Sequence, residues 1–143
     1  MTDKRDYPPH PIVGVGVVVR RDDKFLLIRR IKPPRVGQWS LPGGRQHLGE
    51  TVEEAARREV LEESGLTLSS CRLLTVVDLI ERDPGERVVW HYTLIDFVAE
   101  ADHDRVVAGD DAAEAAWFTL DDAVAAVAWE ETRRILRMAA EAR

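Results

Sequence analysis

Apolar side chains are grouped along this chain in a pattern that predicts β-strands before and after one amphipathic helix. The strand-like runs are rich in β-branched and aromatic residues and are bounded by turn-forming residues. Four such runs occur, at residues 12–20, 24–30, 73–79 and 88–99. Residues 21–23 are expected to turn between the first two strands, and Pro84-Gly85 to close a hairpin between the third and fourth. The first eleven residues contain three prolines and are expected to form an irregular arm.

The segment between the second and third of these strands has a helical period instead. Thr51 followed three residues later by Glu54 is a capping box, and Gly65 suits the left-handed position just past a helix end. A helix over residues 51–64 is therefore predicted. Its apolar stripe comprises Val52, Ala55, Ala56 and Val60.

Two further helical segments are predicted near the end of the chain. Leu120-Asp121-Asp122 is expected to cap a short helix, and residues 129–142 to form the terminal one. Residues 31–38 and 100–112 are expected to be loops, and Pro42-Gly43-Gly44 a turn. Strands on both sides of a helix, followed by a terminal helix, predict an α/β fold with a mixed sheet between helical layers.

Three glutamates of the central helix continue its apolar stripe. At about 100° per residue, Glu59, Glu62 and Glu63 fall beside Val52 and Ala56 on the inward side. A glutamate-rich helix is most often a solvated face. Here, three like charges on the inward side and near the helix C-terminus are costly without a cation. Carboxylate oxygens at this density suit Mg²⁺ or Mn²⁺.

The other charges on this helix are expected to form ordinary pairs. Glu53 with Arg57, and Glu54 with Arg58, have the four-residue spacing of surface ion pairs.

The sequence from Gly44 to Leu66, GRQHLGETVEEAARREVLEESGL, resembles the Nudix signature at each of its defined positions. Trp39-Ser40-Leu41-Pro42-Gly43 before it is similar to the usual lead-in of that family. The resemblance implies a Nudix α/β/α sandwich, one Nudix hydrolase domain over residues 1–143, and a short strand at residues 115–119. It also implies a reaction, hydrolysis of the diphosphate linkage in a nucleoside diphosphate joined to another group.

Roles for individual residues follow from the same resemblance. It implies that Glu59, Glu62 and Glu63 bind Mg²⁺ or Mn²⁺ together with the backbone carbonyl of Gly43. Arg58 would orient the Glu59 carboxylate and Glu50 would support the catalytic site.

The general base stays open between two groups of acidic residues. Within the Nudix sequence the candidates are Glu59 and Glu63, and beyond it they are Asp110, Asp111 and Glu114 of the expected acidic loop.

Charge is distributed unevenly along the chain. The formal net charge is −6, with +5 in residues 1–50 and −11 in residues 51–143, which argues against a nucleic-acid-binding protein. An acidic protein that handles phosphates must supply positive charge locally. The candidates are Arg29, Arg30, Lys32 and Arg35, and a solvated loop is the alternative. Trp39 is expected either to flank the substrate or to lie in the core.

Composition is typical of a globular cytoplasmic protein. No apolar run is long enough to span a membrane, the start lacks the apolar core of a signal peptide, and Cys71 is the single cysteine. The expected partner is a small-molecule nucleotide, with no nucleic acid and no membrane, and a homodimer is among the assemblies allowed.

Three functions compete. The first is hydrolysis of ADP-ribose or a related nucleotide sugar, the second is hydrolysis of (d)NTPs including oxidised ones, and the third is a non-catalytic Nudix binding domain. Intact charged positions in the Nudix sequence disfavour the third.

Overall fold

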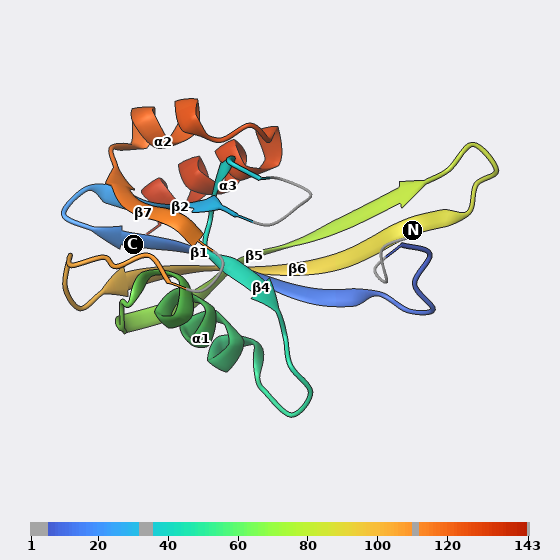
Figure 1. Ribbon diagram of the computed structural model, residues 1–143, viewed down its shortest axis with the longest axis horizontal. Helices are drawn as coiled ribbons and strands as arrows, with labels where there is room; N and C mark the ends of the chain where they lie inside the picture. Colours follow the sequence, from blue (N-terminus) through green and yellow to red (C-terminus); the bar gives the residue numbers. More distant parts are fainter. Residues whose placement is uncertain (1–5, 32–35, 110–111, 143) are drawn as a thin grey trace.

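The computed structural model describes residues 6–31, 36–109 and 112–142, and across them runs one mixed sheet of seven strands (Figure 1). The strands are β1 (Ile12–Arg21), β2 (Lys24–Arg30), β3 (Trp39–Ser40), β4 (Gly43–Arg45), β5 (Leu68–Arg82), β6 (Val88–Ala101) and β7 (Ala112–Phe118). Their order is β3-β2-β1-β6-β5, with β4 also paired to β1 and β7 to β2. Because β1 runs parallel to β6 while the other pairs are antiparallel, the predicted mixed sheet is confirmed.

Helices cover both faces of this sheet. They are α1 (Val52–Ser64), α2 (Leu120–Ala126) and α3 (Glu130–Glu141). Helix α1 lies on one side of the sheet, while α2 and α3 lie on the other (Figure 1). The predicted α/β/α layering is therefore confirmed. None of the described helices is long and apolar enough to cross a membrane.

Helix α1 begins and ends as its sequence predicts. The Glu54 amide donates to Thr51 Oγ1 and the Thr51 amide donates to Glu54 Oε1, each over 3.0 Å, which completes the capping box. Gly65 terminates the helix at φ 75°, a conformation that glycine adopts without steric cost.

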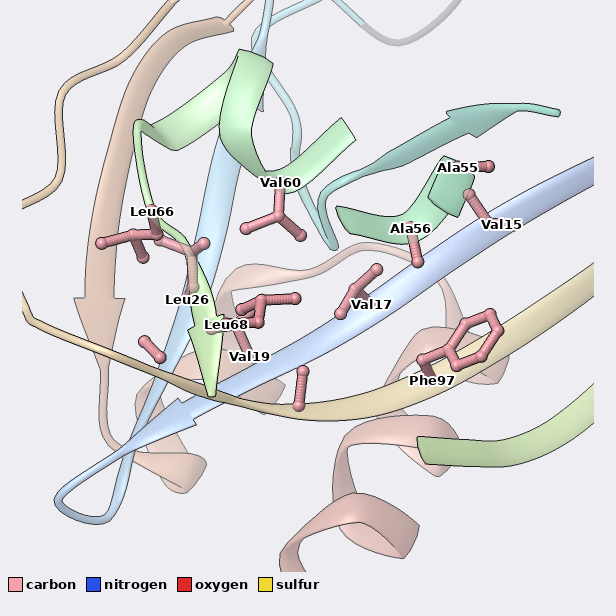
Figure 2. Packing of buried hydrophobic residues seen from close by; sticks show 12 residues of the cluster. Val15, Val17, Val19, Leu26, Ala55, Ala56, Val60, Leu66, Leu68 and Phe97 are labelled. Carbon is pink, nitrogen blue, oxygen red and sulfur yellow. The ribbon is translucent and has the colours of Figure 1, made fainter. Parts of the chain in front are cut away.

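The side of α1 that packs on the sheet is apolar. Ala55, Ala56 and Val60 are fully buried, and Figure 2 shows them above Val15 and Val17 of β1. Alternate residues of β1 face opposite layers, so the neighbouring Val18 packs instead in the second core beneath α2 and α3. These two cores fix the height and orientation of α1, and with it the position of its glutamates.

Several strands are longer than their sequences predict. Strand β5 begins at Leu68 instead of residue 73 and reaches Arg82, because its polar first residues pair with β6 across two register shifts. Strand β7 begins at Ala112 instead of residue 115, since Ala112 already pairs with Arg30. Pairing partners, which a single strand sequence does not reveal, set these ends.

Beyond the body of the sheet, β5 and β6 continue as a two-stranded ribbon (Figure 1). The first pair between β1 and β6 is Ile12 with Tyr92, so among the described residues β6 is paired only with β5 before that point. The described part of the N-terminal arm lies against the ribbon tip. There, the Tyr7 hydroxyl donates to Asp83 over 3.1 Å and the Arg87 guanidinium lies 4.4 Å from the centre of the Tyr7 ring.

Candidate active site

Two adjacent glycines bring the backbone of β4 close to both β1 and α1. Gly43 and Gly44 were predicted in a turn, but both lie in β4, where Gly43 pairs with Gly16 and Gly44 with Val15. A Cβ on Gly43 would lie 2.1 Å from the Val15 carbonyl oxygen, and a Cβ on Gly44 would lie 2.5 Å from Glu59 Oε1. The prediction of a turn is wrong because strand pairing extends through both glycines. The missing side chains leave the space that the Glu59 carboxylate occupies.

Glu63 is a buried carboxyl group at the centre of the site. It is 7% exposed, and its Oε1 accepts a hydrogen bond of 3.0 Å from the Gly43 amide. Burial raises the pKa of Glu63 well above its usual range, and the hydrogen-bonded Glu59 carboxylate raises it further, while the Gly43 amide and the charge of Arg30 oppose the shift. Two adjacent carboxylates in this setting must hold a proton or a cation between them.

Arg58 holds the surrounding carboxylates in place. Its Nε and Nη2 donate to the two oxygens of Glu50 over 2.7 and 2.9 Å, and its Nη1 donates to Glu59 Oε1 over 2.8 Å. A longer contact of 3.3 Å reaches Glu62. The hydrogen bonds from Arg58 lower the pKa of Glu50 to about 2. The predicted Glu54–Arg58 pair is wrong, because Glu54 caps the helix while Arg58 turns toward the site.

The donor atoms of this site fit a hard divalent cation. Within the described residues, no three histidine, cysteine or acidic side chains form a group that could hold a metal ion. The Glu62 side chain is 41% exposed and paired with Arg58, so its predicted inward orientation is wrong. Glu59 and Glu63 remain as an adjacent pair of carboxylates. Mg²⁺ is commonly bound by one or two carboxylates, with water and substrate phosphates completing its coordination.

A cavity of about 730 Å³ lies next to β4, and the side chains of Glu59 and Glu63 are not part of its lining. Its lining includes Gly43 and Gly44 at the carboxylate end, the sheet on one side and the start of α3 on the other. Three aromatic residues are also part of the lining, namely Trp90 and Tyr92 of β6 and Trp129, which precedes α3. This volume is of the size that binds a small ligand.

The two arginines at the end of β2 have different surroundings. Arg30 lines the cavity, and its charge acts on Glu63. Arg29 instead forms an ion pair with Glu114, its cross-strand neighbour on β7. Glu114 was expected in an acidic loop, and that placement is wrong because β7 already includes it. Of the predicted substrate-binding arginines, Arg30 therefore reaches the cavity, while Arg29 is paired away from it.

The structure separates the remaining predicted residues into two groups. Trp39 is not part of the cavity lining and packs edge-on against Phe118, with ring centres 5.0 Å apart, which supports the core alternative. Arg35, Asp110 and Asp111 lie outside the described residues.

Sequence reasoning missed one cavity residue that carries a polar group. Asp96 lies in the middle of the apolar run of β6, is only 6% exposed and lines the cavity. A lone carboxylate inside an otherwise apolar strand is the signal that would have found it.

Comparison with known proteins decides the family. The family model described as NUDIX domain matches residues 10–139. This chain belongs to the Nudix family. A solved Nudix structure, the MutT hydrolase of Burkholderia pseudomallei, is 33% identical with a TM-score of 0.74, over 90% of this chain and 98% of that one. The resemblance seen in the sequence and the Nudix fold are both confirmed.

Two Nudix relatives have names that specify substrates. The ADP-ribose pyrophosphatase of Methanocaldococcus jannaschii is 42% identical over 113 residues, which is 79% of this chain and 64% of that protein. The 8-oxo-dGDP phosphatase of Homo sapiens is 38% identical over 86 residues, 54% of this chain and 26% of that protein. This chain thus spans less than two thirds of the length of either relative.

Proposed function

We propose that this chain hydrolyses the diphosphate linkage of ADP-ribose or a related nucleotide sugar, using Mg²⁺ or Mn²⁺. The observation that carries the proposal is the adjacent carboxyl groups of Glu59 and the buried Glu63. Glu63 accepts a hydrogen bond from Gly43, and both Gly43 and Arg30 line the 730 Å³ cavity. The substrate choice rests on the relative from Methanocaldococcus jannaschii, whose name specifies ADP-ribose. A single domain, a cytoplasmic location and a homodimer remain predictions that accompany it.

In this mechanism the residues of the chain position the diphosphate and manage its charge. Arg30 binds a phosphate oxygen, because it lines the cavity and its charge also acts on Glu63. Glu59 and Glu63 would hold the cation, which would supply positive charge to stabilise the charge of the diphosphate. The Gly43 carbonyl and Glu62 are the further ligands that we propose, Glu62 after release from Arg58.

Arg58 and Glu50 act together as a positioning pair. The two bonds between them fix the guanidinium, which in turn fixes the Glu59 carboxylate at 2.8 Å. We assign the general base to the Glu59–Glu63 pair, since Glu114 forms an ion pair with Arg29, its cross-strand neighbour on β2.

Turnover of a nucleotide panel tests this proposal. ADP-ribose, related nucleotide sugars, dNTPs and 8-oxo-dGDP are incubated with Mg²⁺ or Mn²⁺ and the released products are quantified. We expect the highest kcat/KM for ADP-ribose or another nucleotide sugar. Glu63→Gln should lower kcat by about 10³-fold or more, because a metal ligand is lost. Glu53→Gln is the matched control, since Glu53 is an exposed glutamate of the same helix paired with Arg57.

Three outcomes would contradict the proposal. A kcat for Glu63→Gln within threefold of wild type at saturating Mg²⁺ would remove Glu63 from the site. A preference for 8-oxo-dGDP or dNTPs would favour the second candidate, which the similarity to the human 8-oxo-dGDP phosphatase supports. No turnover of any panel member would favour a binding domain.

A further inference from the structure

Asp96 is a buried carboxyl group that the hydrolysis proposed above does not use. It is 6% exposed, and no hydrogen bond to its carboxyl group is present among the described residues. Buried polar groups are almost always hydrogen-bonded, so the partner of this carboxyl group is water or a ligand that comes from outside the protein. Because Asp96 lines the 730 Å³ cavity, a ligand bound there can be that partner.

The surrounding chain is adapted to hold this carboxyl group where it is. Asp96 pairs with Gly16 of β1, and a Cβ on Gly16 would lie 2.5 Å from Asp96 Oδ1. Any larger residue at position 16 would push the carboxyl group aside. Gly16 also pairs with Gly43 of the catalytic site. Asp96 on β6 is therefore connected through Gly16 on β1 to Gly43 on β4, next to the Glu59–Glu63 pair.

The chemistry of the cavity limits what Asp96 can bind. Trp90, Tyr92 and Trp129 provide flat apolar surfaces, while Arg30 and the β4 backbone lie at the phosphate end. A ligand that fits both the aromatic surfaces and the phosphate end must combine an anionic group with a planar ring system that carries hydrogen-bonding groups. A nucleotide has this combination, with the diphosphate at the carboxylate pair and the base at Asp96.

We propose that the Asp96 carboxyl group reads the donor–acceptor edge of an adenine base inside this cavity. Adenine offers the N1 acceptor next to the N6 amino donor. A neutral carboxyl group offers an O–H donor next to a carbonyl acceptor, so the two edges match with two hydrogen bonds. This inference rests on the proposed function for the position of the diphosphate.

The environment of Asp96 favours the neutral form that this pairing needs. Burial raises the pKa of Asp96 to about 7, and the Glu131 carboxylate raises it further, while the Arg134 guanidinium opposes the shift. Glu131 and Arg134 both lie on α3. Besides Asp96 and Glu131, the charged residues described in the cavity lining are Asp6, Arg30 and Arg45. An ionised carboxylate would offer acceptors alone, which suit the two adjacent N–H donors of guanine instead.

Binding of AMP and GMP, measured by calorimetry, tests this assignment without requiring turnover. Wild type should bind AMP at least tenfold more tightly than GMP at pH 6, and this ratio should fall at pH 8.5 as Asp96 ionises. The ratio cancels the ionisation of the phosphate group that both nucleotides share. Asp96→Asn keeps a donor beside an acceptor, so it should retain AMP binding and remove the pH dependence of the ratio.

Two further variants complete the experiment. Asp96→Ala should weaken AMP binding at least tenfold, because both hydrogen bonds are lost. Asp78→Asn, an exposed carboxylate on the neighbouring strand β5, is the matched control and should bind AMP as wild type does.

Three results would overturn the assignment. They are AMP binding by Asp96→Ala within twofold of wild type, a wild-type preference for GMP that Asp96→Asn abolishes, and no AMP binding by wild type. A failure of the proposed function looks different. In that case AMP binding would follow the expected pattern, while ADP-ribose and related sugars would not be hydrolysed.

Discussion

Replacing Gly44 by alanine should disable the site while leaving the fold intact. A Cβ at this position would lie 2.5, 2.6 and 2.9 Å from three atoms of the Glu59 carboxylate, whereas ordinary van der Waals contact begins at 3.4 Å. The carboxylate must therefore move by about 1 Å. Its hydrogen bond from Arg58, now 2.8 Å, would lengthen beyond the range of a hydrogen bond.

The size of the effect follows from that displacement. A shift of about 1 Å in a catalytic group can lower the rate by about 10²-fold, equivalent to about 2.7 kcal/mol of transition-state stabilisation. The backbone at Gly44 does not have a positive φ, so alanine causes no backbone strain there. We therefore expect kcat/KM to fall by about 10²-fold and the melting temperature to change by only a few degrees.

The assay combines kcat/KM on the best substrate with a Mg²⁺ titration and a melting curve. Gly85→Ala is the matched control. A Cβ on Gly85 would meet only Asp83 Oδ1, at 3.4 Å, in the exposed hairpin turn. If Gly44→Ala remains folded and keeps kcat/KM within threefold of wild type, then the Glu59 carboxylate does not act from the position described here.

Three further predictions concern charge in the site. Arg30→Ala should lower kcat/KM by about ten- to a hundredfold through loss of a charge-assisted phosphate contact. Arg29→Ala should keep kcat/KM within about twofold of wild type, because it loses only the exposed ion pair with Glu114. Equal effects of the two variants would refute the distinction. Millimolar Mg²⁺ should raise the melting temperature of wild type much more than that of Glu59→Gln/Glu63→Gln, and equal shifts would place the ion elsewhere. Because the folded-state pKa of Glu63 is raised, its stabilising contribution in metal-free protein is complete below its unfolded pKa of about 4.5. That contribution is lost as pH rises through the folded-state value, so melting temperature should fall with rising pH, and a flat profile in metal-free wild type would contradict this.

Local sequence rules predicted the elements whose structure depends on local interactions. Helix α1 has its capping box at Thr51 and its left-handed Gly65 where the sequence predicts them, because both features depend on residues within one turn. The carboxylates were harder to place. Glu62 lies at the edge of the apolar stripe, and its side chain turns to solvent, where it pairs with Arg58. The position of Arg58 depends in turn on packing against β4, where it donates to the Arg45 carbonyl.

Features that depend on long-range pairing were not predictable from the sequence. Gly43 and Gly44 carry turn-forming residue types, yet they extend the sheet because β1 provides a partner strand. Arg29 and Arg30 are adjacent in sequence and were both candidates for binding phosphate, but only the position of β7 reveals which of them is already paired. Asp96 acquires its environment from α3, which follows it by more than thirty residues.

One wall of the cavity is formed by the ribbon of β5 and β6. This ribbon is the part of the sheet that we expect to open most easily. Trp90 lies on β6 before β1 joins at Tyr92, so its backbone is held by β5 alone among the described strands. A two-stranded ribbon is only marginally stable in water, and local opening is easiest where few neighbours are present. Amide hydrogens around Trp90 should therefore exchange with solvent faster than those of Val17 and Val18 on the central strand. We expect opening of this ribbon to limit the rates of nucleotide entry and product release. Glu63, in contrast, stays hydrogen-bonded to Gly43 in the slowly exchanging body of the protein.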